Sequence, residues 1–111
     1  MKNSKNLKNS REEVRQLTGF IGVYIFSKKG KIQYIGKSIN VKARLLSHFE
    51  NALIDPKERL IIKNSDSIEC IETDSEFKAL LLESKLIQTH HPRYNIRWRD
   101  DKSYLYIRRW Y

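Results

Sequence analysis

The sequence predicts one small α/β domain in which short strands pack against helices, and three observations support this fold class. The chain has 111 residues, the length of a single domain. Two runs rich in β-branched and aromatic residues, 20–27 and 31–36, flank a short basic turn that contains a glycine. Two later stretches, 41–51 and 73–92, place capping residues ahead of apolar residues at helical spacing.

The first segments are polar. Residues 1–10, MKNSKNLKNS, are basic and repetitive, and we interpret them as a mobile arm; a tail that only aids solubility is an equal alternative. REEVRQL is expected to form a short helix. The chain therefore divides into an arm with a short helix over 1–18 and a folded domain over 19–111.

The next segment predicts a β-hairpin. If Lys28, Lys29 and Gly30 form a three-residue turn closed by Ser27 and Lys31, Gly30 takes the left-handed position. The register then places Tyr24 directly opposite Tyr34 on one face of the sheet. A two-residue turn would shift this register and separate the two tyrosines.

Helices and a third strand follow the hairpin. Asn40 can cap a helix over 41–51, and Pro56 suits the first turn of a helix over about 55–63. SIECIET predicts a strand in which Cys70 is a small core residue. Thr73 and Glu76 fit a capping box for the last helix, which Pro92 ends. Its apolar stripe is expected to be Phe77, Leu80, Leu81, Ser84 and Ile87, and a last strand is expected near 104–108.

The charge distribution points to a polyanionic partner. The net charge is +9, and residues 14–49 hold seven basic residues and no acidic one. Residues 50–83 carry a local charge of −5, and residues 84–111 carry +5. Two basic segments around an acidic one suggest one positive face, which favours nucleic acid over a membrane surface. The single cysteine and the lack of a signal-peptide pattern or membrane-length apolar run predict a cytoplasmic protein.

Several side chains could carry chemistry. Glu83 has apolar residues three and four positions away on both sides, so it is either a single-carboxylate Mg²⁺ ligand or an edge residue paired with a lysine. Arg44 and His48 share one helix face and offer a phosphate ligand and a proton carrier, although a solvated face gives the same pattern. Lys37 follows Gly36 at a turn where a phosphate could bind. No zinc spacing, glycine-rich phosphate loop or nucleophile elbow is present in the sequence.

These motifs together resemble the GIY-YIG nuclease superfamily. GVY is followed ten residues later by YIG, and YIGKSINVKARLLSHF and ALLLESKLIQTHHPRYNIRWRDDKSYLYI follow in order. Within the superfamily the chain resembles the N-terminal incision domain of the excision-repair nuclease UvrC and its small homologue Cho, over about residues 20–107. The resemblance implies a small α/β domain with a three-stranded antiparallel sheet flanked by helices. It also implies metal-dependent hydrolysis of one phosphodiester bond of DNA.

The resemblance also implies site residues. The family's metal-binding glutamate matches Glu83, its helix arginine matches Arg44, and its lysine after the YIG glycine, Gly36, matches Lys37. Its tyrosine pair matches Tyr24 and Tyr34, and the asparagine of its PxYN motif matches Asn95, which is expected to fix a loop or to bind a phosphate. Many members carry a histidine where His48 stands, whereas UvrC proteins often have tyrosine there. The first motif reads Gly-Val-Tyr in place of Gly-Ile-Tyr, and the proline common before it in UvrC is absent.

The hypothesis for mechanism follows from these roles. Glu83 holds Mg²⁺, with Mn²⁺ as a substitute, while Arg44 and Lys37 stabilise the charge on phosphorus. Tyr24 is expected to take the proton of the attacking water, which requires its pKa to fall by roughly 2 to 3 units; His48 is the rival base. DNA-backbone contacts are expected from Lys42, Arg93, Arg97 and Arg99.

The expected partners are DNA and excision-repair damage-recognition proteins, with no membrane and no small-molecule cofactor, at the bacterial nucleoid. The alternatives are a non-catalytic DNA-binding module and a domain that only docks a repair protein. UvrC proteins have a second nuclease domain and a DNA-binding repeat, which this sequence lacks. The chain is therefore expected to be either a fragment of a UvrC-like protein or a compact stand-alone nuclease.

Overall fold

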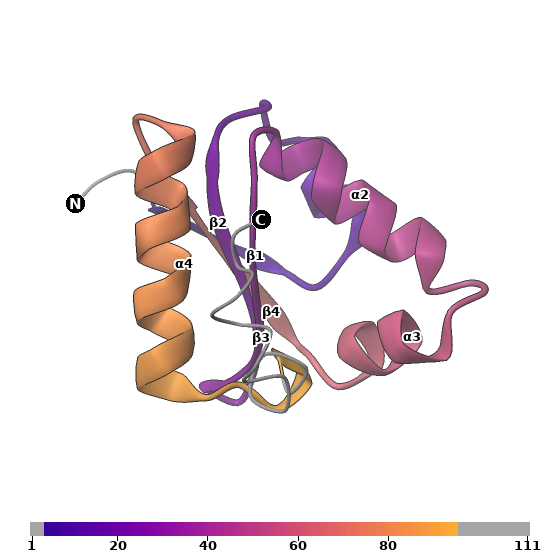
Figure 1. Cartoon of the computed structure of the whole chain (residues 1–111). Coiled ribbons are helices and arrows are strands. Elements are labelled where there is room, and N and C mark those ends of the chain that lie inside the picture. Colours follow the sequence, from indigo (N-terminus) through magenta and orange to yellow (C-terminus); the bar gives the residue numbers. More distant parts are fainter. Residues whose placement is uncertain (1–3, 96–111) are drawn as a thin grey trace.

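The computed structural model describes residues 4–95 and shows a four-stranded antiparallel sheet with helices on both faces (Figure 1). The strands are β1 (Ser4–Lys8), β2 (Gly22–Lys28), β3 (Lys31–Ser38) and β4 (Ser67–Glu72). The helices are α1 (Arg11–Arg15), α2 (Val41–Asn51), α3 (Pro56–Lys63) and α4 (Glu76–His90), followed by the 3₁₀ turn η1 (Arg93–Asn95). The predicted fold class is confirmed. The strand expected near 104–108, and Arg97 and Arg99, lie outside the described residues.

The sheet has one more strand than expected, because part of the predicted arm pairs with it. Strand order is β1-β4-β2-β3, and Leu7 of β1 lies opposite Ile68 of β4. Leu7 is partly buried against the core, so this segment contributes apolar surface as well as backbone hydrogen bonds. The interpretation of residues 4–8 as a mobile arm is therefore wrong.

The predicted register of the hairpin is also wrong. The turn has two residues, Lys29 and Gly30, both with positive φ (50° and 81°), which suits the twist of a two-residue hairpin. Lys28 therefore pairs with Lys31, and a β-bulge follows in which Gln33 is the extra residue of β3. The turn and the bulge each shift the predicted register by one residue. The total shift is two residues, the period of side-chain alternation in a strand, so the tyrosines remain on one face. Tyr24 lies opposite Gly36, and Tyr34 is its diagonal neighbour.

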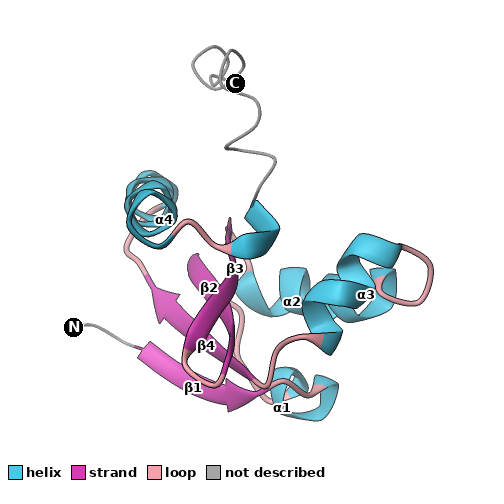
Figure 2. Ribbon diagram, turned by 90° about the horizontal axis from the view of Figure 1, so that it is seen from below, coloured by secondary structure: helices cyan, strands magenta, loops and turns pink. Residues whose placement is uncertain are grey.

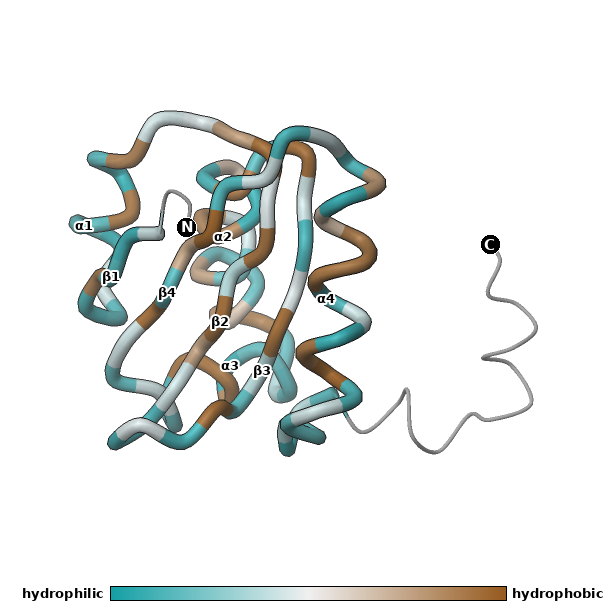
Figure 3. Tube along the Cα trace, turned by 90° about the vertical axis from the view of Figure 1, so that its left-hand side faces the viewer, coloured by the Kyte–Doolittle hydropathy of each residue, from teal (hydrophilic) through white to brown (hydrophobic). Residues whose placement is uncertain are grey.

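Helices cover both faces of the sheet (Figures 1 and 2), and an apolar cluster on each face holds them. Alternate residues of β2 point to opposite faces, so Tyr24 and Phe26 pack towards α1, α2 and α3. Val23 and Ile25 pack with Ile35 towards α4. The apolar segments of β2, β3 and α4 lie close together in Figure 3. β3 is an edge strand, and both α4 on one face and α2 on the other contact it.

Local sequence signals explain most helix boundaries. Asn40 caps α2 through a 3.0 Å bond from the Ala43 amide, and Asp55 caps α3 ahead of Pro56. The cap of α4 is Ser75, whose hydroxyl accepts from the Lys78 amide, so the predicted capping box of Thr73 and Glu76 is wrong.

The stripe predicted for α4 is also largely wrong. The residues turned towards the sheet are Ala79, Glu83 and Ile87, with Leu82 and Leu86 partly buried beside them. Phe77, Leu80 and Leu81 are exposed, by 41–65%. The small side chain of Ala79 lets the helix lie close to the sheet, and this orientation turns Glu83 inward.

Candidate active site

A buried aromatic cluster lies under α2 on one face of the sheet. Tyr24 is 1% exposed, and its ring centroid lies 6.4 Å from that of Tyr34 and 5.3 Å from that of His48. The Tyr24 hydroxyl lies 2.7 Å from Nε2 of His48. Arg44, one turn before His48 on α2, lies close enough to Tyr24 to influence its ionisation. Four of the residues expected at the site, Tyr24, Tyr34, Arg44 and His48, thus lie together in the fold.

Gly36 makes room for the Tyr24 ring. A Cβ atom at Gly36 would lie 2.3 Å from the Tyr24 hydroxyl and 2.4 Å from its Cζ, distances that real Cβ atoms do not adopt. The ring therefore lies across the backbone of β3, and the hydroxyl reaches towards the free edge of the sheet. The glycine after the second tyrosine is needed for this crossing. The Tyr24 ring occupies the space that the missing side chain leaves free.

Glu83 approaches the same edge from the α4 side. The residue is 8% exposed, and no hydrogen bond or ion pair to it is present within residues 4–95. Burial raises the pKa of Glu83 to about 7, and the opposing effect of Lys37 is smaller. Lys37 lies opposite Val23, on the α4 face of β3, and not at the turn after the strand. The charge of Glu83 also acts on Tyr24, so the two faces meet electrostatically at this edge.

The ionisation of Tyr24 differs from the prediction. Burial is the main cause that raises its pKa above 10, Tyr34 adds to the rise, and Arg44 only partly opposes it. The expected fall of this pKa is therefore wrong, because Arg44 acts less strongly than desolvation. Burial lowers the pKa of His48, and Arg44 lowers it further, while Glu58 opposes both. His48 is therefore a neutral acceptor for the Tyr24 proton near pH 7.

Asn95 holds the next segment against the edge of the sheet. Its side-chain oxygen accepts from the Ile35 amide and its side-chain nitrogen donates to the Ile35 carbonyl, both at 3.0 Å. Asn95 is 3% exposed, so its amide completes the ladder of an edge strand and takes the place of a further strand. Of the two roles expected for Asn95, fixing the loop is the one that the geometry supports.

Sequence reasoning missed Glu58. This residue is in the first turn of α3, and its carboxylate contacts Nδ1 of the fully buried His48. Its position, ten residues after His48 and in another helix, follows no helical spacing. An acidic residue in the first turn of a helix is explained by the helix dipole alone, so no sequence pattern indicates this contact.

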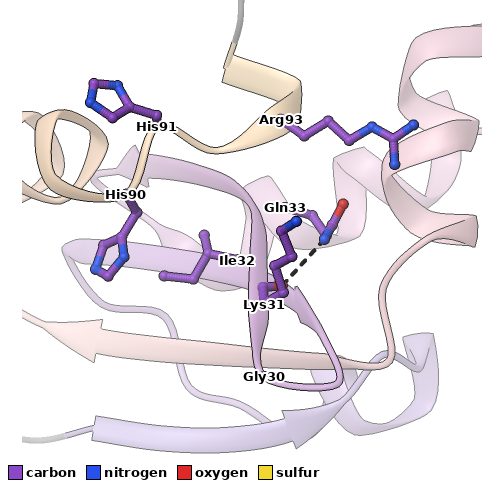
Figure 4. Close-up of a pocket in the computed structure, with 7 residues that line it drawn as sticks. All are labelled: Gly30, Lys31, Ile32, Gln33, His90, His91 and Arg93. Atoms are coloured by element: carbon purple, nitrogen blue, oxygen red, sulfur yellow. Dashed lines mark hydrogen bonds between the residues drawn. The ribbon is translucent and has the colours of Figure 1, made fainter.

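The remaining expected site residues lie apart from the cluster. Lys42 is half-buried on α2. Arg93 lines a basic hollow at the other end of β3 (Figure 4), and its guanidinium lies 5.1 Å from the centre of the Tyr94 ring. Lys31, His90 and His91 line the same hollow, where the Gln33 amide donates to the Lys31 carbonyl.

The donor set suits a hard cation that keeps most of its water. Within residues 4–95 no three His, Cys, Asp or Glu side chains cluster to hold a metal by themselves. A single buried carboxylate without a hydrogen-bond donor is what a Mg²⁺ ion with water and phosphate ligands requires. Cys70 is buried, and burial raises its pKa to about 11, which fits the predicted core role. Among the described helices, none has both the length and the apolar character needed to cross a membrane.

Comparison with known proteins places the chain in one family. The family model of the UvrC-like GIY-YIG domain matches residues 21–96, most of the described chain. UvrABC system protein C of Caldicellulosiruptor saccharolyticus is 41% identical over 98 residues, which cover 87% of this chain and 16% of that protein. The protein of the same name from Bdellovibrio bacteriovorus is 42% identical over 107 residues, covering 95% of this chain and 17% of that one. This chain thus belongs to the UvrC-like GIY-YIG domain family, and it spans about a sixth of the length of these relatives.

A solved structure covers the same unit. The GIY-YIG N-terminal endonuclease domain of UvrC from Thermotoga maritima, bound to magnesium as its catalytic divalent cation, superposes with a TM-score of 0.71 at 33% identity. The match covers 76% of this chain and 92% of that one.

Proposed function

We propose that this chain is a Mg²⁺-dependent endonuclease domain that hydrolyses one phosphodiester bond of DNA during excision repair. The observation that carries the proposal is the convergence at one sheet edge of a buried carboxylate, unpaired within residues 4–95, with a phenol–imidazole pair and a guanidinium. Family membership and the magnesium-bound Thermotoga domain support the same reaction. The net charge of +9 supports a polyanionic substrate.

Each group has a role in this reaction. Glu83 would hold the metal, which would supply positive charge to the phosphoryl oxygens. Arg44 and Lys37 stabilise the negative charge that builds on phosphorus. As the water oxygen bonds to phosphorus and the bond to the 3′ oxygen breaks, the water proton passes to the Tyr24 oxygen. The Tyr24 proton passes to Nε2 of His48, and the 3′ oxygen takes a proton from solvent.

This relay replaces the choice between Tyr24 and His48 as the base. A phenol with a raised pKa does not ionise alone near neutral pH. A phenol that is hydrogen-bonded to a neutral imidazole can instead take up the water proton as it passes its own proton to the imidazole. Tyr34 orients the phosphate or the water beside Tyr24. Lys31, Lys42 and Arg93 are proposed to contact the DNA backbone, and excision-repair proteins that recognise damage are proposed partners of a larger assembly at the nucleoid.

A plasmid-nicking assay tests the function. We expect the chain to convert supercoiled DNA to the open-circular form in Mg²⁺, with Mn²⁺ as a substitute. We expect no nicking in EDTA. Glu83→Ala should abolish nicking while DNA binding in EDTA changes less than about twofold, because the carboxylate serves the metal. Glu76→Ala, at an exposed position of the same helix, is the control and should nick normally. Full cleavage by Glu83→Ala in Mg²⁺ would remove the metal assignment, and DNA binding without nicking by the unmodified chain would favour a non-catalytic module.

A further inference from the structure

His48 is held from both sides of its ring. The ring is fully buried, with the Tyr24 hydroxyl at Nε2 and the Glu58 carboxylate at Nδ1. The two contacts come from different elements, β2 and α3, so the ring orientation is fixed by the packing of α3 as well as by the sheet. Glu58 is 17% exposed, and its carboxylate therefore lies largely out of water against the imidazole.

The local sequence explains why a carboxylate reaches this position. Asp55 caps α3 and Pro56 begins it, which fixes the direction of its first turn. The short connection after α2 folds α3 back onto that helix, so the first turn of α3 lies beside the last turns of α2 (Figure 1). A carboxylate is also favoured at the amino end of a helix. Glu58 thus meets His48 without a cost to its own helix.

The chemistry of the two contacts determines the tautomer. A neutral imidazole carries one N–H, and an ionised carboxylate can only accept a hydrogen bond. The N–H therefore lies on Nδ1 and donates to Glu58, which leaves the Nε2 lone pair to accept from the Tyr24 hydroxyl. The other tautomer would carry its N–H on Nε2, which could then not accept from the Tyr24 hydroxyl. It would also turn the Nδ1 lone pair towards the Glu58 carboxylate.

We propose that Glu58 is a positioning residue of this site, which holds His48 in the tautomer whose Nε2 can receive the Tyr24 proton. The inference deepens the proposed function and rests on it for its kinetic consequences, whereas the tautomer itself does not depend on turnover. When Nε2 gains the proton, His48 becomes an imidazolium and Glu58 becomes its counter-ion. Glu58 would then act both before and during the transfer without contacting the DNA.

The tautomer can be measured directly. Nitrogen-15 NMR of the histidine ring in the full chain at pH 7.5 in EDTA reports which ring nitrogen carries the proton. We expect His48 to be protonated at Nδ1 in the unmodified chain and in Glu58→Gln, whose side-chain oxygen can still accept. In Glu58→Ala we expect a shift towards the Nε2–H form. An unchanged tautomer in Glu58→Ala would overturn the proposal.

Kinetics add a second readout. We expect the single-turnover rate of nicking to fall roughly 10²-fold in Glu58→Ala and roughly tenfold in Glu58→Gln, since an amide accepts the hydrogen bond without stabilising the imidazolium. The pH profile of nicking should also change in Glu58→Ala. The groups that face His48 are Tyr24 and Phe26 of β2, Tyr34 of β3, Arg44 of its own helix and Glu58, and the variant removes the carboxylate from this set. Glu50→Gln removes an exposed carboxylate of α2 and should retain the unmodified rate and profile.

A double mutant separates positioning from a structural role. His48→Tyr replaces the imidazole with a phenol, which has no tautomer to select. In that background Glu58→Ala should change the residual rate by less than about twofold, with thermal unfolding used to confirm that each variant is folded. An equal loss in both backgrounds would contradict the proposal. If the unmodified chain cuts no DNA, the proposed function fails, while the NMR result still decides the role of Glu58.

Discussion

At the residue scale, burial rather than an electropositive field dominates the ionisation of Tyr24 and His48. Tyr24 lies among aromatic rings, so desolvation keeps its phenol protonated despite the neighbouring Arg44. Burial also keeps His48 neutral. Burial therefore moves the two pKa values across this hydrogen bond in opposite directions, so the protonated phenol donates to a neutral imidazole. Charge along the sequence alone could not show this, because it carries no information on depth.

Glu83 should make the fold less stable as the pH rises. Its folded pKa of about 7 exceeds the ordinary 4.5, so between these values the native state binds more protons than the unfolded state. Stability contributed by the protonated form is therefore complete below about pH 4.5 and is lost as the pH rises to about 7. Glu83→Gln does not titrate, so we expect it to be more stable than the unmodified chain at pH 8 by roughly 1–3 kcal/mol. The difference should be smaller at pH 5.

Urea unfolding in EDTA at the two pH values measures this difference. Glu76→Gln, which removes an exposed carboxylate from the start of the same helix, is the control and should show a smaller change between pH 5 and pH 8. A stability gain for Glu83→Gln that is equal at both values would mean that the buried carboxylate is not the cause. A gain confined to pH 8 would show that the ionised carboxylate lowers the stability of the fold, as expected for a group kept for function.

At the element scale, the features that depend on local chemistry were predictable and those that depend on packing were not. The caps Asn40 and Asp55 with Pro56 determine α2 and α3 from a few adjacent residues. The orientation of α4 was not predictable, because residues 79–82 are apolar on every side and the sheet selects the face. The bulge at Gln33 likewise compensates for a turn whose length the sequence left open.

The β1 strand shows the same limit and allows a direct test. Its residues are polar except Leu7, so its composition is typical of a tail, yet it pairs with β4 along five residues. Deleting residues 1–8 should expose the edge of β4 and lower the free energy of unfolding by roughly 1–3 kcal/mol. Leu7→Ala should account for much of this loss, and Asn6→Ala, on the exposed side of the strand, for little. An unchanged urea midpoint in the deletion variant would restore the interpretation as an arm.

At the scale of the whole molecule, the two edges of the sheet differ in function. The edge formed by β3 carries the site near Gly36 and the basic hollow near Gly30, and α2 and α4 lie on either side of it. The opposite edge, β1, serves the fold and also carries lysines. The net charge of +9 alone does not say which edge meets DNA, but the position of the site predicts that it is the β3 edge.

Salt-dependent binding should distinguish the two edges. We expect the unmodified chain to bind duplex DNA without sequence preference, around micromolar or weaker at physiological salt in EDTA, with affinity falling steeply as salt rises. Removing Lys31 and Lys37 of β3 as a Lys→Gln pair should weaken binding roughly tenfold and reduce the slope of log K against log salt by about 2. The matched pair Lys5→Gln and Lys8→Gln on β1 removes the same charge and should leave the slope nearly unchanged, because counterions are released only where phosphates are contacted. Equal losses for both pairs, measured by fluorescence anisotropy on one labelled duplex, would mean that net charge and not the β3 edge determines the binding.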